Sequence, residues 1–168
     1  MKRKVMVLSC LLALFSSENE TRAAEAICTA TIMPAISTTK TSDLVFGVIL
    51  PSETLGTVTI TPLSTENSER THSGGVQLVA STSGAASFNV SGATNTSFTV
   101  TFDNSAINIT NGTDTMTVRS FTIYPPSGTT KLNNDGLATF NVGGTLDVGE
   151  NQPPGNYSGS FTVNVAYQ

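Results

Sequence analysis

The single histidine, His72, is the first candidate for catalysis, because a triad of serine, histidine and aspartate needs an imidazole as its base. His72 lies in the polar run PLSTENSERTHSGG, residues 62–75, which we expect to be a surface loop. A catalytic base must be held in a fixed orientation beside its nucleophile, and a long loop does this poorly. We therefore expect His72 to be a solvated side chain.

Acidic and glycine-rich runs are the other places where chemistry could occur. Glu66 and Glu69 share the loop with His72, but no apolar run beside them would form a pocket that raises a carboxyl pKa. The oxygen-rich stretches 103–105 and 133–136 lack EF-hand spacing, and we expect turns there. FNVGGTLDVGE has a strand pattern and no helix after it, unlike a phosphate loop. The sequence predicts no enzyme, no metal site and no cofactor.

The first residues have the pattern of a secretory signal peptide. Basic residues at 2–4 precede the apolar run VMVLSCLLALF at 5–15 and small residues in TRAAEA at 21–26. The apolar run is shorter than the roughly 20 residues that a membrane-spanning helix needs. It also continues past Cys10, which argues against lipid attachment there. We expect export, a signal peptide over residues 1–24 with cleavage after Ala24 or Ala26, and a single domain over residues 25–168.

Charge argues against two classes of partner. Residues 25–168 carry four basic and ten acidic side chains, a net charge of −6 with His72 neutral. Such a chain repels the phosphates of nucleic acids and the headgroups of anionic membranes. We therefore expect neither nucleic acid nor an anionic membrane surface as a partner. We also expect no membrane span once the signal peptide is removed.

Removal of the signal peptide leaves Cys28 as the only cysteine of the exported chain. An intramolecular disulfide is then impossible, and a zinc site would need ligands from more than one chain. The apolar and β-branched neighbours in ICTATI favour a small buried side chain. Two alternatives remain open for Cys28, an intermolecular disulfide and a reactive thiol.

The exported chain has the pattern of an all-β protein. It is rich in threonine, serine, valine, glycine and asparagine, and no stretch keeps helical periodicity over three turns. The expected strands are 27–33, 43–49, 55–61, 75–80, 85–91, 96–102, 106–110, 114–124, 137–148 and 157–167. Many short strands in a domain of this length favour an immunoglobulin-like β-sandwich over a barrel.

The phase of the alternation predicts the core, because residues two apart lie on one face of a strand. The expected core residues are Leu44, Phe46, Val48, Val58, Ile60, Val76, Leu78, Phe88, Val90, Phe98, Val100, Phe102, Ala138, Phe140, Val142, Leu146 and Val148. The phase changes between Val118 and Phe121, which predicts a bulge or a change of sheet near Arg119. Asn111 and Gly112 tolerate positive φ and predict a hairpin turn.

The chain closes on PGNYSGSFTVNVAYQ, an alternating strand with Tyr167 penultimate and Gly155 fourteenth from the end. The apolar positions of this strand are Phe161, Val163, Val165 and Tyr167. This ending resembles the C-terminal motif of chaperone-usher pilins, the subunits of bacterial fimbriae. With KTSDLVFGVILP at 40–51, the chain also resembles a secreted bacterial family described only as a domain of unknown function. That family is in turn similar to the spore-coat-protein-U type of pilin.

The resemblance implies an incomplete, pilin-like immunoglobulin fold. Its missing strand would come first from a periplasmic chaperone and then, at an outer-membrane usher, from the leading segment of the next subunit. The strand that binds chaperone and subunit would contain Gly155, Phe161, Val163, Val165 and Tyr167. The donor would be EAICTATIMP, residues 25–34, in which Ala26, Cys28, Ala30 and Ile32 alternate with Ile27, Thr29, Thr31 and Met33.

These patterns favour an exported structural subunit that reaches the cell surface and forms a homopolymer, a fimbria or surface layer, by strand exchange. A second hypothesis is a self-contained secreted or cell-surface binding module, in which residues 27–33 pair with 157–167 of the same chain. An exported enzyme of an unrecognised type is the third.

Overall fold

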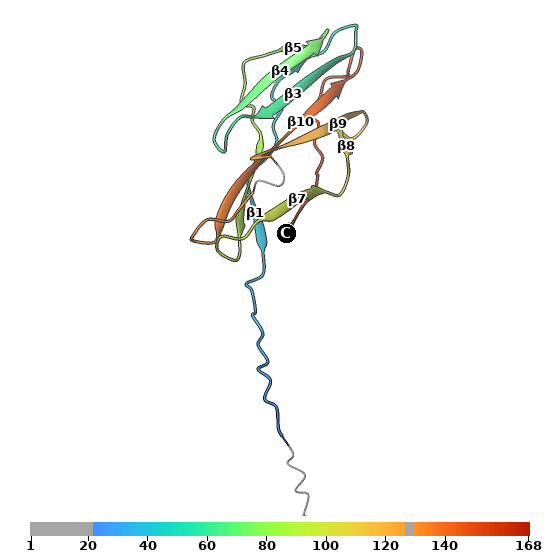
Figure 1. Ribbon diagram of the computed structural model, residues 1–168. Helices are drawn as coiled ribbons and strands as arrows, with labels where there is room; N and C mark the ends of the chain where they lie inside the picture. The colour runs from blue at the N-terminus through green and yellow to red at the C-terminus, as the bar shows by residue number, and fades with distance from the viewer. Residues whose placement is uncertain (1–21, 127–129) are drawn as a thin grey trace, which may run out of the picture. The chain divides into compact units, whose positions relative to one another are not determined.

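The computed structural model of the chain describes residues 22–126 and 130–168 (Figure 1). Most of the expected signal peptide, residues 1–21, lies outside the described residues. The chain divides into two units, Met1–Ile32 and Met33–Gln168. Within the described residues, we find no helix that is long and apolar enough to cross a membrane.

The predicted strand at 27–33 is wrong. Residues 22–32, the described part of the first unit, have no strand assignment and their side chains are exposed. A strand is defined by hydrogen bonds to a neighbouring strand, and apolar alternation does not supply that neighbour. The alternating side chains of this segment therefore remain in solvent.

The second unit is all-β in its described residues, and its strands form a curled antiparallel sheet with two short additional pairs. Its strands are β1 (Ser37–Ser42), β2 (Ile49–Leu50), β3 (Gly56–Pro62), β4 (Ser68–Gly74), β5 (Gln77–Leu78), β6 (Ala86–Ser91), β7 (Phe98–Phe102), β8 (Ala106–Thr110), β9 (Thr115–Tyr124), β10 (Leu137–Val148) and β11 (Val163–Tyr167). The short pairs are β2 with β5 and β7 with β11.

The long strand β10 organises the sheet, because it pairs with three other strands. Residues 141 and 142 pair with both β6 and β9, so these two strands lie on opposite edges of β10. Residues 145–147 pair with both β3 and β9, so β3 shares the edge of β6. One edge of β10 therefore pairs with β6 and then β3, while the other pairs with β9 (Figure 1).

The two halves of β10 contribute to two hydrophobic clusters. Phe140 and Val142 belong to the first cluster, and Leu146 and Val148 belong to the second. The first cluster also contains Ala86, Phe88, Val90, Phe98, Val100 and Leu132, and the second contains Val58, Val76 and Val118. The predicted phase of β10 is confirmed. Val48, predicted to be in the core, is 52% exposed.

Gly143 lies where β6 gives way to β3 along β10. A Cβ atom at this residue would lie 2.1 Å from the carbonyl oxygen of Ile60, so only glycine lets the strands approach this closely. The pairing of β10 with β9 shifts register between Gly143 and Thr145, and Ser120 on β9 has a positive φ of 52°. The bulge predicted near Arg119 is confirmed.

The predicted polar loop at 62–75 is wrong over much of its length. It contains β4, which pairs with all of β3, and exposed His72 lies opposite Val58. The strand β1 was not predicted either, and it pairs with β6. Both are polar strands with largely exposed side chains, so backbone pairing forms them without apolar alternation.

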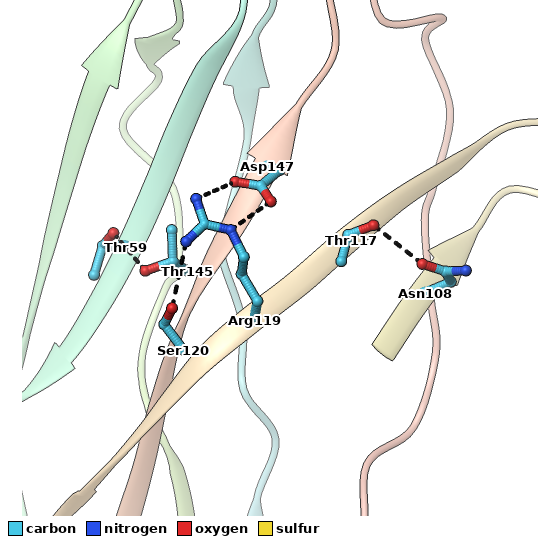
Figure 2. A network of polar contacts seen from close by, with 7 residues as sticks. All are labelled: Thr59, Asn108, Thr117, Arg119, Ser120, Thr145 and Asp147. Carbon is cyan, nitrogen blue, oxygen red and sulfur yellow. Dashed lines mark hydrogen bonds and ion pairs between the residues drawn. The ribbon is translucent and has the colours of Figure 1, made fainter. Parts of the chain in front are cut away.

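Polar pairs join the strands on the face opposite the hydrophobic clusters (Figure 2). The hydroxyls of Thr59 and Thr145 lie 3.0 Å apart, and the guanidinium of Arg119 donates to both carboxylate oxygens of Asp147 at 2.7 and 2.8 Å. The hydrogen bonds that Arg119 donates to Asp147, and then the negative charge of Asp147, raise the pKa of Arg119 above its ordinary value. These cross-strand pairs link β3, β10 and β9 along their polar side.

Replacing Phe140 tests the first cluster. Phe140 is fully buried and its ring stacks on Phe88 with centroids 5.1 Å apart. We expect Phe140→Ala to lower the free energy of unfolding by about 3–5 kcal/mol in urea denaturation. Leu137→Ala is the matched control on the same strand, because Leu137 is 52% exposed, and it should cost less than about 1 kcal/mol. Equal losses in the two variants would contradict this assignment of the core.

Candidate functional site

An open cleft of about 960 Å³ lies beside the second hydrophobic cluster. Two backbone segments border it, residues 43–51 and 152–161, which we call the first lip and the second lip. Apolar residues of β8, β9 and β10 form its floor, and Ala86 and Phe88 of β6 also line it. The floor residues are Ile107, Ile109, Met116, Val118, Leu146 and Val148. Among the described lining residues, only Lys40 and Asp43 are charged, and they form an ion pair. The cleft is therefore largely apolar and bordered by two backbone segments.

The first lip is hydrogen-bonded along its outer edge. The amide and carbonyl of Val45 pair with those of Gly84, both at 2.9 Å, and the carbonyl of Val48 accepts from Val79 at 3.1 Å. The backbone groups of Leu44 make no hydrogen bond within the described part of the chain. Successive residues of an extended segment direct these groups to opposite edges, so those of Leu44 face the cleft side.

The second lip is also held at its outer edge. The amide and carbonyl of Ser158 pair with those of Thr110, at 3.0 and 2.9 Å. The hydroxyl of Tyr157 donates to the carbonyl of Pro153 at 2.8 Å and accepts from the side-chain Nε2 of Gln152 at 2.9 Å. Residues 159–161 form no backbone hydrogen bond to any described residue. This lip, like the first, has an unpaired backbone edge.

The two lips run in opposite directions. The strand β1 is antiparallel to β6, and β6 is antiparallel to β10, so the first lip continues in the direction of β10. The strand β8 also runs in the direction of β10, because both are antiparallel to β9. The second lip is antiparallel to β8 at the bridge between Thr110 and Ser158. An extended chain between the lips would be parallel to one and antiparallel to the other.

This arrangement suits the binding of an extended polypeptide. The free amides and carbonyls of the lips can form main-chain hydrogen bonds with an inserted strand. Ile107 and Ile109 on β8, with Met116 on β9, are half-buried and present apolar surface to every second side chain of such a strand. A strand in the cleft would therefore remove both unpaired backbone groups and exposed apolar surface from water.

Two of the predicted site residues line the cleft. Gly155 and Phe161 both belong to the second lip. The ring of Phe161 also lies 5.1 Å from that of Phe121 and 6.3 Å from that of Phe88, measured between centroids. Phe161 therefore connects the cleft with the first hydrophobic cluster.

The other three predicted residues of this strand lie on β11, which pairs with β7. Val163, Val165 and Tyr167 are opposite Phe102, Val100 and Phe98, and all three pack against the first cluster. The hydroxyl of Tyr167 accepts from the amide of Ala93 at 2.6 Å and donates to the carbonyl of Pro34 at 2.9 Å. None of the three lines the cleft, and the predicted strand at 157–167 begins only at Val163.

The predicted donor residues belong to the first unit. Ala26, Cys28, Ala30 and Ile32 are exposed, and Cys28 is a free thiol. The expectation that Cys28 is buried is wrong for the single chain. Ile27 and Ile32 are 91% and 95% exposed, so large apolar side chains of this segment lie in water.

Sequence reasoning did not assign the floor to the site. Ile107 and Ile109 alternate in INIT, and Met116 and Val118 alternate on the next strand. The hairpin at Asn111 and Gly112 was predicted and brings these strands together, with Ile107 opposite Val118. The alternation of both strands predicts an apolar face on this hairpin. The structure adds that no other described strand packs over the part of this face that lines the cleft.

The hydroxyl of Tyr167 supports a testable prediction. Tyr167→Phe leaves the buried amide of Ala93 without its partner, so we expect the free energy of unfolding to fall by about 1–3 kcal/mol. The control is Tyr157→Phe, which removes a hydroxyl bonded to exposed Pro153 and should cost at most about 1 kcal/mol. Urea denaturation of both variants measures the difference, and an unchanged Tyr167→Phe would show that these bonds add no stability.

Comparisons with known proteins place the second unit in a family. Neither the search of curated proteins nor that of solved structures returns a match. A family model described as "Domain of unknown function (DUF4402)" matches residues 36–167, from just before β1 to the end of β11. The matched residues include both lips and the floor of the cleft, but not the leading segment, residues 25–34. The chain belongs to this family of domains of unknown function.

Proposed function

We propose that the protein is an exported structural subunit of a bacterial fimbria or surface assembly, in which the cleft of one copy accepts the leading segment of the next. On this proposal the second unit is a pilin-like, immunoglobulin-type sandwich that lacks one strand. The observation that carries the proposal is the apolar cleft between two lips with unpaired backbone edges. An inserted strand is the ligand that satisfies both features together.

The leading segment has the length and composition that the cleft requires. Residues 25–34, when extended, span about 33 Å, and the nine residues of the first lip, 43–51, span at most about 30 Å. The segment has no basic residue and a single acidic one, Glu25, at its start. Its apolar residues lie in solvent in the single chain, so their insertion into a second molecule would bury them.

The position of Pro34 favours insertion into another molecule over insertion into the same one. Pro34 precedes β1, and its carbonyl accepts a hydrogen bond from Tyr167. To reach its own first lip, the segment would have to reverse at Pro34 and return along residues 35–42, which include β1. This return uses about 26 Å, which leaves about one of residues 25–33 to enter the cleft. Insertion in trans avoids this loss.

Strand donation between copies gives a polymer. The accepting surface and the donated segment are different parts of the chain, so the contact is heterologous and does not close on itself. Before polymerisation, the open cleft exposes apolar surface and strand edges that favour aggregation. We propose that a periplasmic chaperone covers the cleft in transit. At an outer-membrane usher, the leading segment of the next subunit then replaces the chaperone in the cleft.

A single proline in the leading segment tests this function. Ala30→Pro removes one backbone amide, and both edges of an inserted strand are needed for pairing with the two lips. We expect the wild-type protein to form a ladder of polymers in electrophoresis without boiling, and the full chain with this substitution to lose that ladder. The matched control, Ala30→Val, keeps the amide and should still polymerise.

A synthetic peptide of residues 25–34, with Cys28→Ser to prevent disulfides, provides the second measurement. It should bind the Ala30→Pro chain and raise its melting temperature, whereas the same peptide with proline at position 30 should not. A wild-type protein that stays monomeric at high concentration and ignores the peptide would contradict strand donation. That result would support the self-contained binding module instead.

A further inference from the structure

Arg70 on β4 is a half-buried cation whose guanidinium contacts the backbone of the first lip. Its Nη1 donates to the carbonyl of Phe46 at 3.0 Å and to the hydroxyl of Ser81 at 3.3 Å, and its Nη2 donates to the carbonyl of Val79 at 2.7 Å. The two ion pairs of the described residues involve other cations. Arg70 therefore joins two backbone segments by hydrogen bonds to neutral acceptors.

These contacts fill a gap in the pairing at the outer edge of the first lip. Val45 pairs with Gly84, and Ile49 pairs with Leu78. Between these pairs the lip advances by four residues and its partner segment by six, so a regular ladder cannot connect them. Ser81 also bridges this interruption of the ladder. Its hydroxyl accepts a hydrogen bond from the amide of Val48 at 2.8 Å and donates one to the carbonyl of Val79 at 3.2 Å.

Gly47 makes room for the guanidinium. A Cβ atom at this position would lie 2.3 Å from Nη1 of Arg70 and 2.6 Å from the hydroxyl oxygen of Ser81. The φ of Gly47 is +78°, a conformation that glycine adopts readily. The kink of the first lip and the position of Arg70 therefore depend on each other.

We propose that Arg70 is a positioning residue, which tethers the first lip from its outer side and so keeps the cleft open for strand addition. This inference rests on the proposed function. Phe46 and Ile49 of the lip are half-buried beside the apolar floor, and burial of apolar surface draws them toward it. Without the tether, the first lip closes over the floor and its inner backbone edge is lost as a binding surface.

The geometry also distinguishes arginine from lysine here. The planar guanidinium reaches three acceptors on two segments with two nitrogens. The ammonium of a lysine is a compact charge that does not reproduce this fork. Charge alone is therefore not sufficient at this position.

The test uses the full chain with Ala30→Pro as the parent, so that the leading segment does not compete for the cleft. Amide hydrogen exchange is measured at Val48 and Val79, and binding of a fluorescent form of the Cys28→Ser peptide is measured by anisotropy. Arg70→Ala should speed exchange at both amides and weaken peptide binding, each by about tenfold or more. Arg70→Lys should also speed exchange at both amides and weaken peptide binding. In both variants, exchange of the amides in β6 should not change.

The matched control is Arg119→Ala, which removes the guanidinium on the opposite face of the sheet and should leave both measurements within about twofold. We expect Ser81→Ala to speed exchange and weaken peptide binding less than Arg70→Ala does. Ser81→Ala takes the place of Arg70→Ala in the test if the Arg70→Ala protein does not fold. Ser81 is exposed and lies outside the strands, so we expect its variant to fold.

The results separate the tether from the proposed function. Unchanged exchange at Val48 and Val79 in Arg70→Ala would overturn the tether. Faster exchange with wild-type peptide affinity would overturn the positioning role. A parent chain that does not bind the peptide would overturn the proposed function, and faster exchange in Arg70→Ala would then still establish that Arg70 holds the first lip.

Discussion

The second hydrophobic cluster has to be shielded from water by strands that come from distant parts of the sequence. Val58 on β3, Val118 on β9 and Leu146 on β10 meet in this cluster because β10 pairs with β3 and β9 on its two edges. The polar pairs between these strands lie on the other face. On the cleft side, the two lips flank the cluster among the described residues, and Ile109 and Met116 remain half-buried. Within this part of the chain, the cluster is therefore only partly covered on the cleft side.

The pairing of the lips explains why most of their residues do not form regular strands. Both lips have apolar alternation, as Phe46 and Phe161 illustrate, and both were expected to be parts of strands. Val45 and Ser158 instead form isolated bridges, and Ile49 and Leu50 of the first lip form the short strand β2. Between the pairs at Val45 and Ile49 the first lip advances by four residues and its partner segment by six, which interrupts a regular ladder. Arg70 partly replaces the missing strand pairing at the first lip, because its guanidinium donates hydrogen bonds to the carbonyls of Phe46 and Val79.

Sequence patterns predicted the parts of the fold in which the two faces of a strand differ. The strand β10 alternates between core and outer positions, and the turn at Asn111 and Gly112 joins β8 to β9. The strands β1 and β4 gave no such signal, because polar side chains are exposed on both of their faces. Their pairing is a property of the backbone, which composition does not reveal. The cleft could not be predicted for a related reason, since alternation shows that a residue prefers burial but not whether a cover exists.

The opposite directions of the lips have a mechanical consequence. In the proposed polymer, a donated strand would lie along both lips, and a pull on the polymer would act along the axis of that strand through Pro34. Such a load is carried by all of the hydrogen bonds between strand and lips at the same time, in shear, whereas a hairpin pulled from one end opens one bond after another. The junction between two subunits would therefore resist tension well although it contains no covalent bond.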